Sequence, residues 1–217
     1  ISSNLRYSSD GSPVYPAAAL GVKIVQDQQG GPKSQKFFKG HNDDILCMAI
    51  DPARKFVATG QVASKSSRGK GSICIWDVHD CRELCRMDGC HQRAVTSLAF
   101  SPDGTQLISI GQDNKNTHKL WTDVGGNWCR VQCTATAVSD QSTVFFSHWL
   151  QGNHPSECAL VSGGAKGINF WQLEGATLVK KQGRFGRKYK QSPLLCAANL
   201  QTTDDKGGAS CWCAVVG

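Results

Sequence analysis

The chain has 217 residues, eleven of them cysteine, and carries a formal net charge of +7. It contains no run of about 18 apolar residues, which excludes an apolar membrane-spanning helix, and no Gly-rich phosphate loop that ends in Lys-Ser or Lys-Thr. Because no signal peptide is visible in the first residues, we expect a cytosolic protein with reduced thiols.

The first segment in chain order, residues 4–25, stands apart from the rest. Its sequence, NLRYSSDGSPVYPAAALGVKIV, includes an apolar run with a Tyr15–Pro16 step and precedes the first histidine of a repeated pattern. We therefore separate residues 1–36 from the repeats as an N-terminal segment.

Three copies of the repeated pattern follow. The first runs from Phe37 to Asp77 and includes FFKGHNDDILCMAIDPARKFVATGQV and ICIWD. The second runs from Cys90 to Trp121, and the third, which is weaker, ends in LVSGGAKGINFW at Trp171. Their shared residues recur at intervals of 45 to 51 positions, which identifies a repeat protein.

Each copy predicts short antiparallel strands. In the second copy, VTSLAF and QLISIG flank the turn SPDG, which has the chemistry of a β-turn between antiparallel strands. The run that ends in Trp121 is a third strand, and NWCRVQC is a fourth. Such units are typical of the WD-repeat blade of a β-propeller. Gly60 aligns with Gly111 with a slip of one residue. The surplus residues of the first copy form an insertion at residues 63–71, where the second copy has only a tight turn around Asp113.

A buried hydrogen-bond network is predicted in the blades. A His bonds a Ser or Thr on the second strand, this hydroxyl bonds the Trp indole N–H on the third strand, and an Asp in the intervening turn orients the His. The second copy has the full set, whereas the first lacks the Asp and the third lacks a clear His. The predicted network residues are His41, Thr59, Trp76, His91, Ser109, Asp113, Trp121, Ser162 and Trp171.

Ser109, His91 and Asp113 also raise the alternative of a hydrolase triad. Nucleophilic catalysis needs an exposed Ser and an oxyanion hole, and a Ser in the middle of a β-strand provides neither. Because buried polar groups must be paired, we favour the structural network. We therefore predict that the protein is not an enzyme and that it has no cofactor.

A zinc site is a second alternative, raised by Cys81, Cys85 and Cys90 with His79 and His91. Their spacing contains no compact Cys-x2-Cys pair, and His91 already has a role in its blade, so we predict no metal site. Cysteines expected singly within strands, as small apolar residues, are Cys47, Cys74, Cys129, Cys158 and Cys196.

The predicted fold is all-β: a partial WD-repeat β-propeller of about three blades and part of a fourth, preceded by the N-terminal segment. An open fan of blades leaves sheet edges exposed, so we expect a segment of a larger polypeptide whose neighbouring repeats stabilise it. The expected boundaries are 1–36 for the N-terminal segment, 37–86 and 87–133 for two WD blades, 134–182 for a degenerate blade, and 183–217 for a basic turn and the start of a further blade.

Positive charge is concentrated in two segments without acidic residues, the insertion and residues 179–191. The insertion connects second and third strands, and the other segment leads from a fourth strand into the next blade; in a WD blade both connections open on one side. A basic face favours an acidic partner, although a solvated charge run is the alternative. The candidate contact residues are Lys65, Arg68, Lys70, Lys180, Lys181, Arg184, Arg187, Lys188 and Lys190.

The order of these segments resembles the echinoderm microtubule-associated protein-like family. The matching stretches are VYPAAALGV, FFKGHNDDI, VATGQV with ICIWD, and CHQRAVTSLAFSPDG, and they extend over most of residues 4–196. GHNDDI joined to ATGQ is more specific than a generic WD signature. The resemblance implies that residues 1–36 hold a hydrophobic HELP motif packed into the propeller, that the propeller is part of a tandem, and that the protein binds tubulin or microtubules.

The resulting functional prediction is a non-enzymatic microtubule-associated protein on the cytoplasmic cytoskeleton. A structural component of ciliary or flagellar doublet microtubules, with axonemal or other cytoskeletal proteins as partners, is a narrower form of this prediction. A general WD-propeller scaffold without direct tubulin contact is the alternative. Phe185 and Tyr189 alone do not make a stacking platform, so we expect no nucleic-acid partner, and we expect no membrane partner.

Overall fold

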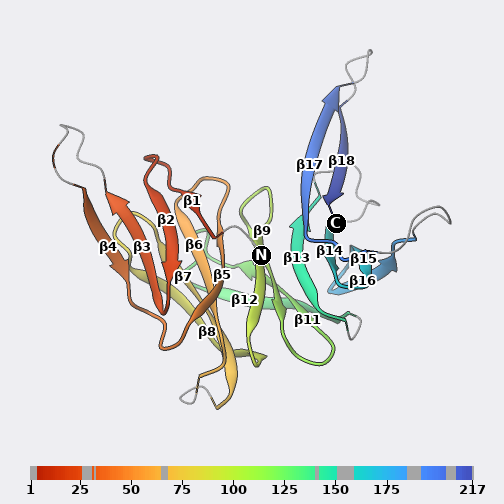
Figure 1. The fold of residues 1–217 in the computed structure, drawn as a ribbon, viewed down its shortest axis with the longest axis horizontal. Helices are drawn as coiled ribbons and strands as arrows, with labels where there is room; N and C mark the ends of the chain where they lie inside the picture. The colour runs from red at the N-terminus through yellow and green to blue at the C-terminus, as the bar shows by residue number, and fades with distance from the viewer. Residues whose placement is uncertain are drawn as a thin grey trace.

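The computed structural model describes residues 4–25, 31, 33–64, 68–139, 142–150, 159–184, 192–203 and 209–216. Within these ranges the chain forms only strands, turns and irregular segments, and no helix is long and apolar enough to cross a membrane. The strands make four four-stranded sheets and one two-stranded sheet, which lie side by side as a fan in Figure 1. The prediction of an all-β partial propeller is confirmed.

Each four-stranded sheet is an antiparallel meander in chain order, and we number the sheets 1 to 4. Sheet 1 contains β1 (Arg6–Tyr7), β2 (Pro13–Ala17), β3 (Leu20–Val25) and β4 (Ser34–Phe38). Sheet 2 contains β5 (Ile45–Ile50), β6 (Phe56–Gln61), β7 (Lys70–Asp77) and β8 (Glu83–Gln92). Sheet 3 contains β9 (Val95–Phe100), β10 (Gln106–Gly111), β11 (Thr117–Asp123) and β12 (Val131–Val138). Sheet 4 contains β13 (Val144–Trp149), β14 (Leu160–Gly164), β15 (Gly167–Glu174) and β16 (Thr177–Gln182). The last pair is β17 (Cys196–Thr203) and β18 (Ala209–Val216).

The N-terminal segment forms a four-stranded sheet of its own, which the sequence did not indicate. The sheets are also offset from the expected boundaries, since β4 extends to Phe38 and β8 extends to Gln92. The reason is that each fourth strand continues almost to the first strand of the next sheet. His91 therefore lies on the last strand of sheet 2, although it begins the sequence copy that forms sheet 3.

The strand register corrects one detail of the repeat alignment. Ile45 pairs with Gln61 in sheet 2, and Val95 pairs with Gly111 in sheet 3. Each pair lies beyond a bulge in its ladder, where one extra residue of the first strand is left unpaired. Gln61 and Gly111 are therefore equivalent positions, and the alignment of Gly60 with Gly111 is wrong by one residue.

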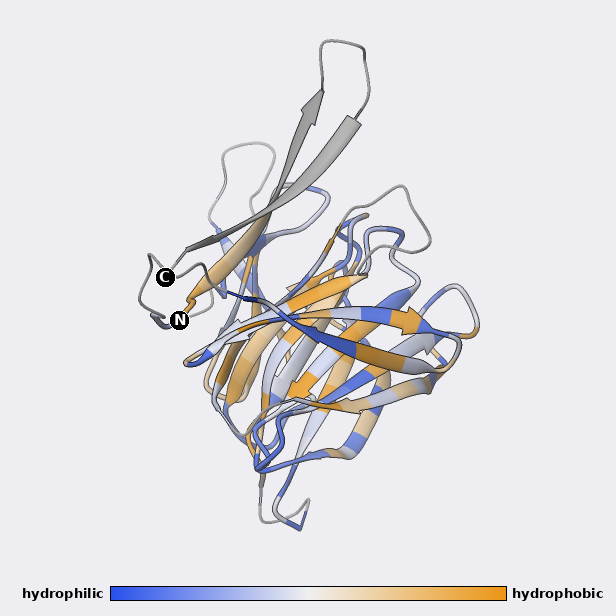
Figure 2. Ribbon diagram, turned by 90° about the vertical axis from the view of Figure 1, so that its right-hand side faces the viewer, coloured by the Kyte–Doolittle hydropathy of each residue, from blue (hydrophilic) through white to orange (hydrophobic). Residues whose placement is uncertain are grey.

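Neighbouring sheets pack through their apolar faces. Figure 2 shows that the strands carry most of the hydrophobic residues and that the connecting turns are mainly hydrophilic. Between sheets 1 and 2, Phe38 stacks on Trp76 with ring centroids 5.0 Å apart, and Val14 and Val57 belong to the same cluster. Gly21 permits this contact, because a Cβ there would lie 2.8 Å from the indole carbon Cζ2 of Trp76.

The other interfaces repeat this arrangement with the tryptophans of the second and third copies. Trp121 lies in a cluster with Ile73 and Ile75 of sheet 2. Trp171 lies in a cluster with Ile108 and Leu120 of sheet 3. The tryptophan that ends each repeat is therefore a core residue of the interface with the preceding sheet.

Candidate functional site

In sheet 2, a histidine, a threonine and a tryptophan form a buried hydrogen-bond network. The Nε2 atom of His41 lies 2.7 Å from Thr59 Oγ1, and the indole N–H of Trp76 donates to the same oxygen at 3.2 Å. Burial lowers the pKa of His41, so its ring is neutral and carries one N–H. All three side chains are buried, so this network is part of the core.

Gln61 completes this network in place of the missing Asp. Its Nε2 group donates to Asn42 Oδ1 at 2.7 Å, which leaves its Oε1 atom as the acceptor that lies 2.6 Å from His41 Nδ1. His41 therefore carries its proton on Nδ1 and accepts at Nε2 from the Thr59 hydroxyl. Sequence reasoning missed Gln61, although its place two residues after Thr59 on the same strand is a usable signal.

The same network recurs where sheet 2 meets sheet 3, with one difference. His91 Nε2 lies 2.7 Å from Ser109 Oγ, and the Trp121 indole N–H donates to this oxygen at 2.8 Å. The expectation that Asp113 orients His91 is wrong. The Asp113 carboxylate instead accepts the backbone N–H groups of Lys115 at 2.9 Å and Thr117 at 3.2 Å, which closes the turn between β10 and β11.

The imidazole ring of His91 consequently makes fewer hydrogen bonds than that of His41. Its Nδ1 atom is buried and has no hydrogen-bond partner among the residues that the structure describes. Burial, together with the positive charge of Lys119, lowers the pKa of His91 to about 3. Gly111 occupies the position of Gln61 here, and a Cβ at Gly111 would lie 2.4 Å from His91 Nδ1.

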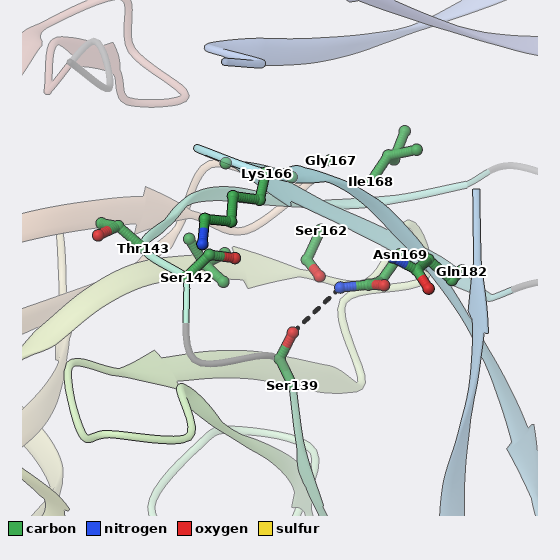
Figure 3. Close-up of a pocket in the computed structure, with 12 residues that line it drawn as sticks. Ser139, Ser142, Thr143, Ser162, Lys166, Gly167, Ile168, Asn169 and Gln182 are labelled. Atoms are coloured by element: carbon green, nitrogen blue, oxygen red, sulfur yellow. Dashed lines mark hydrogen bonds between the residues drawn. The ribbon is translucent and has the colours of Figure 1, made fainter. Parts of the chain in front are cut away.

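In sheet 4, the serine hydroxyl and the tryptophan indole of the network are both present. The Trp171 indole N–H donates to Ser162 Oγ at 2.8 Å. Ser162 also lines a small polar cavity of about 10 Å³, where Asn169 Nδ2 donates to Ser139 Oγ at 3.1 Å (Figure 3). The position equivalent to the two histidines is residue 140, which lies outside the described residues.

The arrangement does not fit the catalytic or zinc alternatives. Ser109 is 0% exposed in the middle of β10, so a substrate has no access to its hydroxyl. Within the described part of the chain, no group of three or more His, Cys, Asp or Glu side chains is placed to hold a metal ion. Of the cysteines expected to be buried in strands, Cys47 and Cys74 are, whereas Cys129 and Cys196 are exposed and Cys158 lies outside the described residues.

The candidate contact residues lie on two different sheets. Arg68 and Lys70 are exposed at the start of β7, and Lys180, Lys181 and Arg184 are exposed on and after β16. Lys181 Nζ donates to Gln172 Oε1 at 2.9 Å. The remaining candidates lie outside the described residues; they are Lys65, Arg187, Lys188 and Lys190.

A polar groove of about 460 Å³ lies between the end of β8 and the β10–β11 turn, and we call it the β8–β11 groove. It brings Lys70 together with Lys115 and Lys119, two residues that sequence reasoning missed. Lys115 lies in the connection between the second and third strands of its copy, as the insertion does in the first copy, and this was the available signal. The described residues that line the groove are Lys70, Gly89, Cys90, His91, Gln92, Asp113, Asn114, Lys115, Thr117 and Lys119.

Comparison with known proteins identifies the family. Residues 34–214 match the family model described as the echinoderm microtubule-associated protein first beta-propeller. The chain belongs to this family. The resemblance inferred from the sequence motifs is therefore confirmed, whereas the HELP motif proposed for residues 1–36 lies almost entirely before the match and stays a prediction.

Curated relatives in the same family span nearly the whole chain. The chain is 32% identical over 214 residues to human echinoderm microtubule-associated protein-like 1, and 30% identical over 216 residues to mouse echinoderm microtubule-associated protein-like 2. It is 29% identical over 219 residues to the 77 kDa echinoderm microtubule-associated protein of Lytechinus variegatus. These alignments include 94–96% of the chain but only 25–31% of each relative, so the chain spans about a quarter to a third of their length.

Proposed function

We propose that this protein is a non-enzymatic microtubule-associated protein that binds tubulin through a basic face of its propeller. Its relatives are named as microtubule-associated proteins. The observation that carries the proposal is a set of exposed basic residues beside the β6–β7 connection and after β16, namely Arg68, Lys70 and Arg184. An exposed basic face attracts an acidic surface and accelerates association with it.

Sheet topology supports a common end for these residues. In an antiparallel meander the connections alternate between the two ends of the sheet. The β6–β7 connection, with Arg68, and the residues after β16, with Arg184, correspond to the same end of their respective sheets. Lys180 and Lys181 pair with Trp171 and Phe170 and lie in the middle of sheet 4. The connections at the other end, between β5 and β6 and between β11 and β12, contain the exposed residues Lys55 and Arg130.

The proposed location is the cytoplasmic cytoskeleton. A position on the doublet microtubules of a cilium or flagellum, with axonemal proteins as further partners, is the narrower form of the proposal. Direct binding to tubulin distinguishes both forms from a scaffold that reaches microtubules only through other proteins.

The proposal is tested by co-sedimentation of the full-length protein with microtubules. Charge reversal at the basic face (Arg68→Glu, Lys70→Glu and Arg184→Glu) is expected to weaken binding about tenfold, because each exposed charge contact contributes little by itself and three are lost together. The matched control reverses the same number of charges at the other end of the sheets (Lys55→Glu, Arg82→Glu and Arg130→Glu) and is expected to bind normally. Unchanged binding of the basic-face variant would rule out this face as the tubulin contact.

A further inference from the structure

We infer that the β8–β11 groove is a docking site for a carboxylate-rich peptide segment of an acidic partner. The inference deepens the proposed function and rests on it for the choice of partner. It assigns a binding role to Lys115 and Lys119, which belong to neither of the two basic segments recognised in the sequence.

The groove has an excess of positive charge. Lys70, Lys115 and Lys119 come from three separate places, the start of β7, the β10–β11 turn and β11. Asp113 is the acid among the described lining residues, and its carboxylate already accepts backbone N–H bonds from Lys115 and Thr117. The lining therefore has a net charge of +2 with His91 neutral, since three lysines oppose one aspartate.

Packing positions two of the three lysines, Lys119 and Lys70. The Lys119 ammonium lies 5.9 Å from the centroid of the Trp121 ring, within the range of a cation–π contact. Lys119 also lowers the pKa of His91, which places its charge within electrostatic reach of the groove lining. The stem of Lys70 passes over Gly89, where a Cβ would lie 3.2 Å from Lys70 Cδ. Gly89 has a φ of 59°, so both its backbone conformation and the Lys70 stem favour glycine.

The size and chemistry of the groove favour a peptide with acidic side chains. Its volume of about 460 Å³ is typical of ligand sites. Gln92, Asn114 and Thr117 add neutral hydrogen-bonding groups to the lysines. Among the described lining residues there is no Arg to bind a phosphate through a bidentate hydrogen bond, and no aromatic side chain on which a base would stack. These features favour carboxylates over the phosphates and bases of a nucleic acid.

The inference is tested by fluorescence anisotropy with a labelled hexaglutamate peptide and the full-length protein at low salt. The groove variant combines Lys70→Gln, Lys115→Gln and Lys119→Gln and is expected to bind the peptide about tenfold more weakly. The control variant combines Lys55→Gln, Arg82→Gln and Arg130→Gln, which removes the same charge at connections of the opposite end and is expected to bind like the unaltered protein. Replacing the three groove lysines with Arg is expected to retain binding, and thermal melting verifies that each variant is folded.

Several results would overturn the groove assignment. They are the absence of peptide binding by the unaltered protein, equal binding by the groove variant, and an equal loss in the control variant. Tighter binding of a single-stranded oligonucleotide of the same charge would overturn the choice of an acidic peptide. A protein that binds the peptide in the groove but does not co-sediment with microtubules contradicts the proposed function alone. If the protein co-sediments with microtubules but its groove variant still binds the peptide, the result contradicts the groove assignment and leaves the proposed function standing.

Discussion

The histidines at the interfaces between sheets are held neutral by burial. The pKa of His91 falls to about 3 and that of His118 to about 4, with burial as the largest cause in both. The ring of His118 lies 4.4 Å from that of Trp171, so it belongs to the interface between sheets 3 and 4. These histidines bind a proton far more weakly in the folded state than in the unfolded state, and the stability of the fold therefore depends on pH.

Acidification is expected to destabilise the fold. Both histidines take up a proton on unfolding below their ordinary pKa of about 6.5. Their stabilising effect is therefore complete above about pH 6.5 and is lost as the pH falls toward 3–4, by roughly 1.4 kcal/mol per histidine per pH unit. Urea unfolding at pH 7.5 and pH 5.5 measures this effect. Equal unfolding free energies at the two pH values would show that the histidines are not buried as described.

Gln61 is expected to contribute to the stability of the fold, although the predicted network did not include it. Gln61→Ala leaves the buried Nδ1–H of His41 without an acceptor, which is expected to cost about 1–3 kcal/mol. Gln112→Ala is the matched control, because Gln112 is exposed. Chemical unfolding of both variants makes the comparison, and equal stability would contradict the role assigned to Gln61.

At the scale of strands and sheets, the repeats were readable because their apolar runs alternate with strong turn signals. VTSLAF, SPDG and QLISIG correspond to β9, its turn and β10 almost residue for residue. Sheet 1 was not predicted as a sheet, because residues 4–25 contain none of the repeat's marker residues. The equivalence of Gln61 and Gly111 was also missed, since a bulge shifts strand pairing without leaving a mark in the sequence.

The packing of sheet 1 on sheet 2 is tested by Gly21→Ala. The added Cβ would lie 2.8 Å from Trp76 and 3.2 Å from Phe38, so the interface must shift, at an expected cost of about 1–3 kcal/mol. In the matched control, Gly125→Ala, the added Cβ meets only Asn127 Oδ1 at 3.3 Å, in an exposed turn. Thermal unfolding of the two variants compares them. A Gly21→Ala variant as stable as the control would mean that the segment does not pack on Trp76.

At the scale of the whole molecule, the fold and the family follow from the sequence motifs. The candidate surface, by contrast, depends on how the strands pack and which distant residues they bring together. Lys70 was recognised from its place in an acid-free insertion. Lys115 and Lys119 were not, because Asp113 and Asp123 make their neighbourhood look neutral in the sequence. Only the packing of β8 against the β10–β11 turn brings these lysines to Lys70, and this juxtaposition joins residues from two successive repeats.

The proposed attachment is electrostatic, so the most direct measurement is co-sedimentation of the full-length protein with microtubules at low and high salt. Exposed charge contacts are screened when the ionic strength rises, because the Debye length falls from about 10 Å at 0.1 M salt to about 3 Å at 1 M. We expect the protein to pellet with microtubules at low salt and to be released at high salt. Absence of binding at low salt, or binding that high salt leaves unchanged, would contradict attachment through the basic face.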